Sequence, residues 1–155
     1  MRIFVDCDSC PSQVREIIAR ASQRTESLSF FVANHKIPHS TNAFTHDIIV
    51  EEGKDKADDY IVDHATEHDI AVTRDILLAE RLVRNKVSVV NDRGNLYTAE
   101  NIRERVSLRN YMLELAQNGL KTEEAGSFGK KELYLFANAF DAVLTKKLKG
   151  ESSEN

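Results

Sequence analysis

The chain opens with MRIFVDCDSCP (residues 1–11), and the predicted fold class follows from the way its apolar run ends. Residues 2–5 are short and rich in β-branched and aromatic side chains, which is typical of a buried strand. Asp6 and Asp8 come directly after this run, and Pro11 suits the first turn of a helix. A buried strand that leads within a few residues into a helix indicates an α/β unit.

The rest of the chain continues this alternation of short apolar strands and amphipathic helices. The order predicts a single α/β domain over residues 1–148, with a mainly parallel sheet and helices on both faces. A disordered C-terminal tail is predicted at 149–155. Residues 92–98 are predicted to form a turn, and residues 120–129 a loop. Strands are expected at 2–5, 28–33, 47–52, 70–73 and 87–91, and helices at 11–25, 55–68, 75–86, 99–119 and 130–147.

The composition narrows the class of protein. The 155 residues are 41% hydrophobic and 30% charged, which fits one compact domain with a core of its own. A net charge of -4 excludes a global basic field that recruits nucleic acid and leaves room only for a local basic patch. No apolar stretch approaches the roughly twenty residues of a membrane-spanning helix, and the first residues do not read as a signal peptide. We therefore expect a cytoplasmic protein without a membrane partner.

Acidic residues follow the predicted strands at one edge of the sheet. Asp6 and Asp8 come after the first strand, Asp75 comes after the fourth, and Asp58 begins the helix that precedes the fourth. Ligands of open α/β sheets bind outside the carboxyl ends of the strands. Carboxylates gathered there repel one another, and Mg²⁺ or Mn²⁺ relieves that repulsion. Such ions activate water and stabilise charge on a phosphate, so these four aspartates are candidate metal ligands and catalytic residues.

A structural interpretation of the same residues stays open. Aspartate is common after strands and at helix starts because it caps helices, and any one of the four is better explained as a cap than as a ligand. Because all four lie at one edge of the sheet, a shared metal site explains them as well as four separate caps do. Asp59 is a lesser candidate than Asp58, because one residue further on it points about 100° around the helix.

Four motifs carry a resemblance to a known family. The segments DCDSCP, KADDYIV, VTRDILLAERL and NDRGNLYTAENIRER, in this order, resemble the YaiI/YqxD family of uncharacterised bacterial proteins. The resemblance runs from Met1 to about Leu144, nearly the whole chain. That family in turn is similar to PIN-like metal-dependent nucleases, which implies a PIN-like fold for this chain.

The resemblance also implies roles for individual residues. PIN-like nucleases hold one or two Mg²⁺ or Mn²⁺ ions with an acidic residue after the first strand, where Asp6 stands. Asp58 matches their Asp-x-x-Ile pattern, Asp75 matches their Thr-x-Asp pattern, and Asp8 matches the second aspartate of the YaiI/YqxD opening. Many PIN nucleases carry a further glutamate in an early helix; Glu16 is present there and is equally explained as a solvated residue.

The two cysteines allow other interpretations. Cys7 and Cys10 form a Cys-x-x-Cys pair between a strand and a helix, where a thioredoxin-like redox pair would lie. A redox pair leaves the aspartates unexplained. A zinc site would need two further ligands, and the histidines that could supply them lie in one polar loop. We expect both thiols to be reduced and dispensable, with Cys10 buried against the first helix.

Basic residues supply the candidate substrate contacts. Arg93 and Arg105 are predicted to face phosphates near the acidic edge, although a solvated helix face is the commoner explanation of such arginines. The sequence thus predicts a metal-dependent nuclease that hydrolyses phosphodiester bonds, with RNA as the expected partner. The alternative is a non-catalytic nucleic-acid or nucleotide binding protein that retains the acidic pocket.

Overall fold

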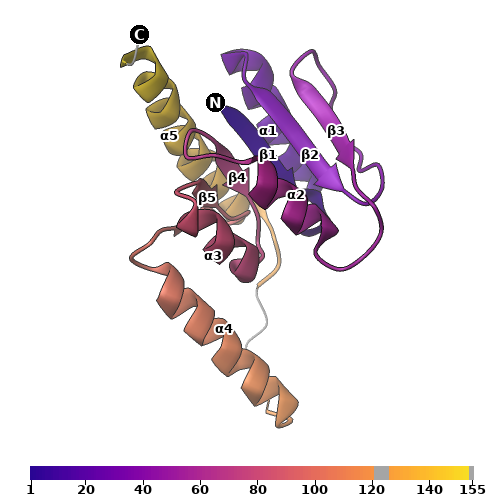
Figure 1. Ribbon diagram of the computed structural model, residues 1–155, viewed down its shortest axis with the longest axis vertical. Helices are drawn as coiled ribbons and strands as arrows, with labels where there is room; N and C mark the ends of the chain where they lie inside the picture. The colour runs from indigo at the N-terminus through magenta and orange to yellow at the C-terminus, as the bar shows by residue number, and fades with distance from the viewer. Residues whose placement is uncertain (121–125, 154–155) are drawn as a thin grey trace.

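A computed structural model shows an α/β domain built on one six-stranded sheet, ordered β3-β2-β1-β4-β5-β6 (Figure 1). It describes residues 1–120 and 126–153, so part of the predicted loop at 120–129 lies outside the described residues. All neighbouring strands pair parallel except β5 and β6, which confirms the mainly parallel sheet. The strands are β1 (Arg2–Asp6), β2 (Leu28–Ala33), β3 (Thr45–Ile49), β4 (Ile70–Val72), β5 (Ser88–Val90) and β6 (Leu96–Tyr97).

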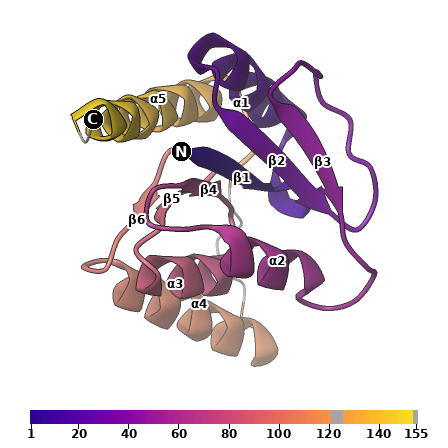
Figure 2. The ribbon, with the colours of Figure 1, turned by 45° about the horizontal axis from the view of Figure 1, so that its top comes forward.

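Helices cover both faces of the sheet, as predicted. Figure 2 shows α1 and α5 on one side of the sheet and α2, α3 and α4 on the other. A short 3₁₀ turn at Cys7–Ser9 joins β1 to α1. The helices are α1 (Ser12–Thr25), α2 (Lys56–His64), α3 (Ile76–Arg84), α4 (Ile102–Gln117) and α5 (Lys130–Ser153).

The two faces are covered because successive side chains of a strand point in opposite directions. In β1, Ile3 and Val5 join the core beneath α1 and α5, where Phe136 is fully buried. Phe4, between them, joins the core beneath α2 and α3, together with Ile61. Neither face of β1 is therefore solvated at residues 3–5, and this is why these positions form a continuous apolar run in the sequence.

β6 is a strand that the sequence analysis missed, because residues 92–98 are predicted only as a turn. Two residues are too few to show a period, and their pairing with β5 depends on the turn between the two strands. Gly94 in that turn has a φ of 86°, a left-handed conformation that favours glycine. A Cβ atom at this position would lie 2.5 Å from the backbone oxygen of Leu135 on α5, so the turn also needs glycine for its close approach.

Several element boundaries differ from the predictions. β3 begins at Thr45, before the predicted start, and α2 ends at His64, before the predicted end. α5 continues through residues 149–153, where the sequence predicts a disordered tail, and residues 154–155 of that tail lie outside the described residues. The carboxyl ends of β1 and β4, where the predicted site lies, each shift by a single residue, to Asp6 and to Val72.

The strand order reverses at the centre of the sheet. From β1 the chain proceeds outward through β2 to β3, and then returns to place β4 on the other side of β1. Connections therefore leave the carboxyl ends of β1 and β4 in opposite directions and leave a crevice between them. In sheets of this order, that crevice is where ligands bind.

Candidate functional site

Asp6 is the most deeply buried acidic residue of the predicted set, with 5% of its surface exposed at the end of β1. Its Oδ2 accepts hydrogen bonds from Thr73 Oγ1 at 2.8 Å and from Ser9 Oγ at 3.3 Å. Burial raises the pKa of Asp6, the nearby carboxylates of Asp8 and Asp75 act in the same direction, and the two hydroxyl groups oppose them. The carboxyl group is thus held in place by neutral donors and lies among like charges.

Thr73 connects two of the predicted residues. Its hydroxyl group donates to Asp6 and accepts from the backbone N–H of Asp75 at 3.0 Å. Asp75 then begins α3, where its Oδ1 accepts from the N–H groups of Leu77 and Leu78 at 2.9 and 3.2 Å. The capping interpretation of Asp75 is therefore correct, and this cap also fixes its carboxyl group close to that of Asp6.

Asp58 lies in the first turn of α2, across the crevice from β1. Its pKa is raised to about 7, chiefly because the side chain is desolvated and further because Asp6, Asp75 and Asp55 are near; Arg81 opposes this rise. Asp55, which directly precedes α2, does not cap the helix: its side chain makes no capping hydrogen bond, and its backbone is left-handed with a φ of 63°.

The neighbouring Asp59 has a different environment. It is exposed, and its Oδ1 forms an ion pair with Arg81 on α3 at a distance of 3.0 Å. It does not line the cavity that Asp58 lines. The single step of about 100° around the helix therefore separates a residue of the crevice from a surface ion pair.

All four predicted aspartates line one cavity of about 270 Å³ at the carboxyl edge of the sheet. We call it the acidic pocket. The sequence analysis missed several of its other residues, because they come from loops whose course the sequence pattern does not reveal. The lining consists of Asp6, Asp8, Ser9, Asn34, Val50, Glu51, Gly53, Asp55, Lys56, Ala57, Asp58 and Asp75.

The donors of the acidic pocket fit a hard divalent cation in type, because six of its nine polar side chains are carboxylates and Ser9 and Asn34 add neutral oxygens; Lys56 is the one cation among the lining residues. Their electrostatics fit as well, since burial and, to a lesser extent, neighbouring carboxylates raise the pKa of both Asp6 and Asp58. Within residues 1–120 and 126–153, however, no three Asp, Glu, His or Cys side chains stand close enough to hold an ion together. A shared ion would therefore require the carboxylates to draw closer.

Comparison with known proteins places this chain in a family. The profile described as "Uncharacterized BCR, YaiI/YqxD family" matches residues 4–146. The chain belongs to the YaiI/YqxD family.

Its relatives in this family are similar over their whole length. A UPF0178 protein of Treponema denticola is 44% identical over 149 residues, which cover 96% of this chain and 95% of the relative. UPF0178 proteins of Treponema pallidum and Syntrophobacter fumaroxidans are 43% and 42% identical, with 96% of this chain covered in both cases and 84% and 97% of the relatives. No solved structure matches the chain.

The two predicted substrate arginines do not line the acidic pocket. Arg93 donates to the backbone oxygen of Gly126, lies 3.8 Å from a carboxylate oxygen of Glu132 and stacks over the ring of Phe128. Its guanidinium group therefore fastens the turn after β5 to the start of α5. Arg105 on α4 is only partly buried.

A third arginine, which the sequence analysis did not select, lies at the same edge of the sheet. Arg74 follows Thr73, and its guanidinium group forms an ion pair with Asp92 after β5. Asp92 is 2% exposed, and its Oδ1 has no hydrogen-bond partner among the described residues. The Arg74 side chain is 53% exposed, so only the Asp92 end of this ion pair is buried, and neither residue lines the acidic pocket.

Both cysteines of this YaiI/YqxD protein are unpaired and buried, which confirms the expectation for Cys10. Burial raises the pKa of the Cys7 thiol to about 12 and also raises that of Cys10. Since the thiolate is the reactive form, a thioredoxin-like role does not fit this environment.

The histidines are also distributed differently from a zinc site. His39 stacks on Phe31 and shares a hydrogen bond with Asp47. His46 stacks on Phe30, the residue that precedes Phe31 in β2. Within the part of the chain that the structure describes, no histidine joins a group of three ligands. These contacts support the interpretation of the histidines as structural or surface residues.

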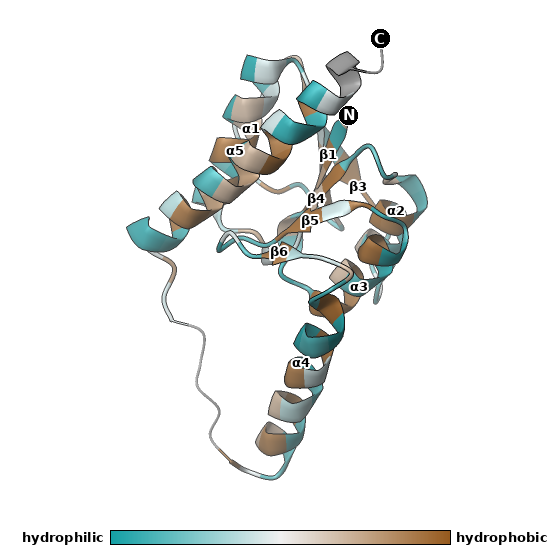
Figure 3. Cartoon of the chain, turned by 90° about the vertical axis from the view of Figure 1, so that its left-hand side faces the viewer, coloured by the Kyte–Doolittle hydropathy of each residue, from teal (hydrophilic) through white to brown (hydrophobic). Residues whose placement is uncertain are grey.

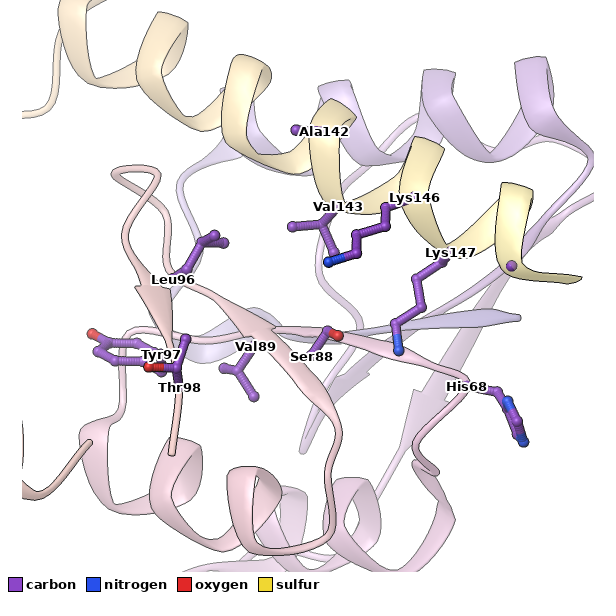
Figure 4. Close-up of a pocket in the computed structure, with 11 residues that line it drawn as sticks. His68, Ser88, Val89, Leu96, Tyr97, Thr98, Ala142, Val143, Lys146 and Lys147 are labelled. Atoms are coloured by element: carbon purple, nitrogen blue, oxygen red, sulfur yellow. The ribbon is translucent and has the colours of Figure 1, made fainter. Parts of the chain in front are cut away.

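A second cavity, of about 580 Å³, lies between α5 and the strands β5 and β6 (Figure 4). Its walls are mostly apolar, with Val89, Tyr97 and Val143 among them, and Lys146 and Lys147 reach into it from α5. Lys147 Nζ also donates to the backbone oxygen of Glu67 at 2.5 Å. No predicted site residue lines this cavity.

None of the helices in residues 1–120 and 126–153 combines the length and the apolar character that are needed to cross a bilayer.

Proposed function

We propose that this protein hydrolyses phosphodiester bonds in RNA with a divalent cation bound in the acidic pocket, and that its fold is PIN-like. One observation carries the proposal. Asp6, Asp8, Asp58 and Asp75 come from three separate segments of the chain, and all four line one cavity at the point where the strand order reverses. Capping alone does not require the four to meet in one place.

Asp6, Asp58 and Asp75 would hold the cation, with Asp8 at the exposed rim. When bound, Mg²⁺ or Mn²⁺ supplies an activated water molecule and neutralises charge that develops on the phosphate. The protein's part is to keep the ligands in place. Thr73 and Ser9 orient the carboxyl group of Asp6, and the N-terminal N–H groups of α3 orient that of Asp75.

The substrate side of the proposal rests on the arginines. Arg105 is the better candidate of the two predicted residues, since it is partly exposed and its charge acts on Tyr97 in β6. Arg93 is already bonded to Gly126 and would have to exchange that contact for a phosphate. The net charge of -4 implies that any attraction of RNA is local to these groups.

The test combines cation binding and turnover on one set of variants. Wild type with millimolar Mn²⁺ should melt at a higher temperature and should cleave a single-stranded RNA oligonucleotide. Asp6→Asn should abolish cleavage and lower Mn²⁺ affinity by about tenfold or more, while stability without added cation stays level or rises because a repulsive charge is removed. Asp63→Asn is the matched control, since Asp63 is exposed on the same helix as Asp58.

A second function is favoured by a specific observation, namely that no three potential ligands stand close enough to hold an ion within the described residues. In this alternative, the protein binds nucleic acid or a nucleotide in the acidic pocket and does not hydrolyse it. RNA binding without cleavage in the presence of Mn²⁺ would select this alternative. No melting shift with Mn²⁺, together with destabilisation by Asp6→Asn, would reject the metal site itself.

A further inference from the structure

Helix α4 (Ile102–Gln117) buries little of its surface against the rest of the protein. Figures 1 and 3 show it leaving the body of the protein and extending away from the sheet. Ile102 is the only buried residue among its described positions, and Val106 packs partly against the core beneath α2 and α3. Past this first contact, four large apolar side chains are exposed: Leu108 (49%), Tyr111 (56%), Met112 (38%) and Leu113 (46%).

Most of these side chains belong to one continuous surface. Leu108, Tyr111, Met112 and the partly buried Leu115 follow the i, i+3, i+4, i+7 spacing that aligns residues along one side of a helix. We call these four residues the α4 stripe. At 100° per residue, the α4 stripe lies roughly opposite Ile102 and Val106, so it faces away from the body. An apolar surface of this extent in water is typical of a binding interface.

The order of residues in the α4 stripe is symmetric. It reads Leu-x-x-Tyr-Met-x-x-Leu, with its midpoint between Tyr111 and Met112. A two-fold axis at that midpoint sets Leu108 against Leu115 of the partner subunit and Tyr111 against Met112 of the partner subunit. This is the self-complementarity that a closed two-fold interface requires, since the same patch must match itself.

The charges on α4 favour the same arrangement. Its first half, residues 102–109, carries three arginines and one glutamate, whereas its second half, residues 110–117, carries only Glu114. An antiparallel pair places each basic half beside an acidic half, and a parallel pair would place basic beside basic. The stripe itself contains no charge, which favours an apolar partner over the phosphates of RNA.

We propose that two copies of this chain form a two-fold dimer through antiparallel packing of their α4 stripes. The dimer does not depend on the proposed nuclease function, because no residue of the stripe lines the acidic pocket. Each copy would cover the apolar residues that the other leaves in water.

Sedimentation of the full chain over a range of concentrations measures this directly. Wild type should reach a mass twice the 17.5 kDa of one chain. Met112→Glu should raise the dissociation constant by about tenfold or more, because it places a charge near the axis in both copies. Leu113→Glu is the matched control: Leu113 is similarly exposed on the same helix but lies outside the stripe, so the dimer should persist.

Three outcomes would overturn the proposal: a monomeric wild type at all concentrations, a dimer that Met112→Glu leaves intact, or a dimer that only Leu113→Glu dissociates. RNA binding that Met112→Glu weakens in a monomeric protein would assign the stripe to nucleic acid instead. Circular dichroism of each variant verifies that α4 is still helical.

Cysteine cross-linking tests the antiparallel orientation. Met112→Cys should form a disulfide-linked dimer, because the two copies of position 112 lie near the axis. Leu108→Cys alone should not, since its copies are separated by about 10 Å along the helices, beyond the span of a disulfide. A mixture of Leu108→Cys and Leu115→Cys chains should cross-link. Efficient linkage of Leu108→Cys to itself would show a parallel pair and refute the arrangement. The buried Cys7 and Cys10 keep the wild-type background low.

Discussion

The acidic pocket and the α4 stripe both hold side chains in unfavourable surroundings: the pocket buries carboxylates beside one another, and the stripe exposes apolar side chains to water. The two differ in how many contacts hold these side chains in place. In the pocket, like charges are drawn together and partly buried, and hydrogen bonds from Thr73, Ser9 and the start of α3 hold them there. On α4, apolar side chains stand in water, and only the first turns of the helix contact the body.

The comparison separates two kinds of functional surface. In the acidic pocket, contacts within one chain fix the carboxyl groups of Asp6 and Asp75, although the carboxylates would have to draw closer to share an ion. The α4 stripe has no such internal support, and in the proposed dimer it would gain its contacts from the partner. Substitutions in the pocket should therefore affect a single chain, whereas substitutions on the stripe should affect association.

The largest effect on a single chain is expected at Thr73. Thr73→Val removes the hydroxyl group that donates to Asp6 and leaves a buried carboxyl group without that partner. The free energy of unfolding should fall by about 1–3 kcal/mol, as measured by denaturant titration. Thr73→Ser keeps the hydroxyl group and should retain most of the stability. Equal stability of the valine variant and wild type would mean that this hydrogen bond does not organise the pocket.

Next in size is the difference between two adjacent aspartates in Mn²⁺ binding. Asp58→Asn should weaken Mn²⁺ affinity by about tenfold, because Asp58 lines the acidic pocket. Asp59→Asn should change it by less than about twofold, since Asp59 pairs with Arg81 on the surface. Calorimetric titration of both variants measures the contrast. Equal losses would show that α2 contributes overall charge and not a specific ligand.

A smaller effect concerns pH. Because the pKa of Asp58 is raised to about 7 in the folded protein and is ordinary in the unfolded one, the folded state binds more protons between these values. Stability without added cation should therefore fall as the pH rises through about 7. The change from about pH 6 to about pH 8 should be at most about 1 kcal/mol, given that the side chain is partly solvated. Asp58→Asn should flatten this dependence, and a profile unchanged by that substitution would exclude Asp58 as its source.

The smallest effect is expected on the α4 stripe of a single chain. At concentrations where the protein is monomeric, Leu108→Ala should alter the free energy of unfolding by less than about 0.5 kcal/mol, because Leu108 is 49% exposed. Ile102→Ala, on the buried side of the same helix, should destabilise by about 2 kcal/mol or more. A large loss at Leu108 would indicate that the stripe packs within its own chain.

The local sequence pattern was sufficient to select the acidic residues, because each of them lies close to the end of a strand or the start of a helix. Continuous apolar runs predict strands that are buried on both faces, and parallel strands deliver their carboxyl ends to one edge. Asp6 ends β1, Asp58 lies in the first turn of α2, and Asp75 caps the start of α3. Membership of the YaiI/YqxD family agrees with the motifs in which these residues occur.

Contacts between residues far apart in the chain were decided only by the tertiary structure. Arg74 pairs with Asp92, and Arg93 contacts Glu132, across separations that no periodic pattern encodes. β6 exists because Gly94 lets its turn approach α5, which contributes the backbone beside it.

α4 shows the same division most clearly. Its residues predict a helix, and the sequence is right about that helix, since helical spacing and Gly119 beyond its end are local properties. Which side of α4 is covered depends on where the body of the protein ends, and that is a property of the packed chain. By itself the sequence therefore determined every helix, every strand except β6, and the acidic residues at their ends. Only the tertiary structure decided that α4 would reach past the core and leave most of its apolar stripe in water.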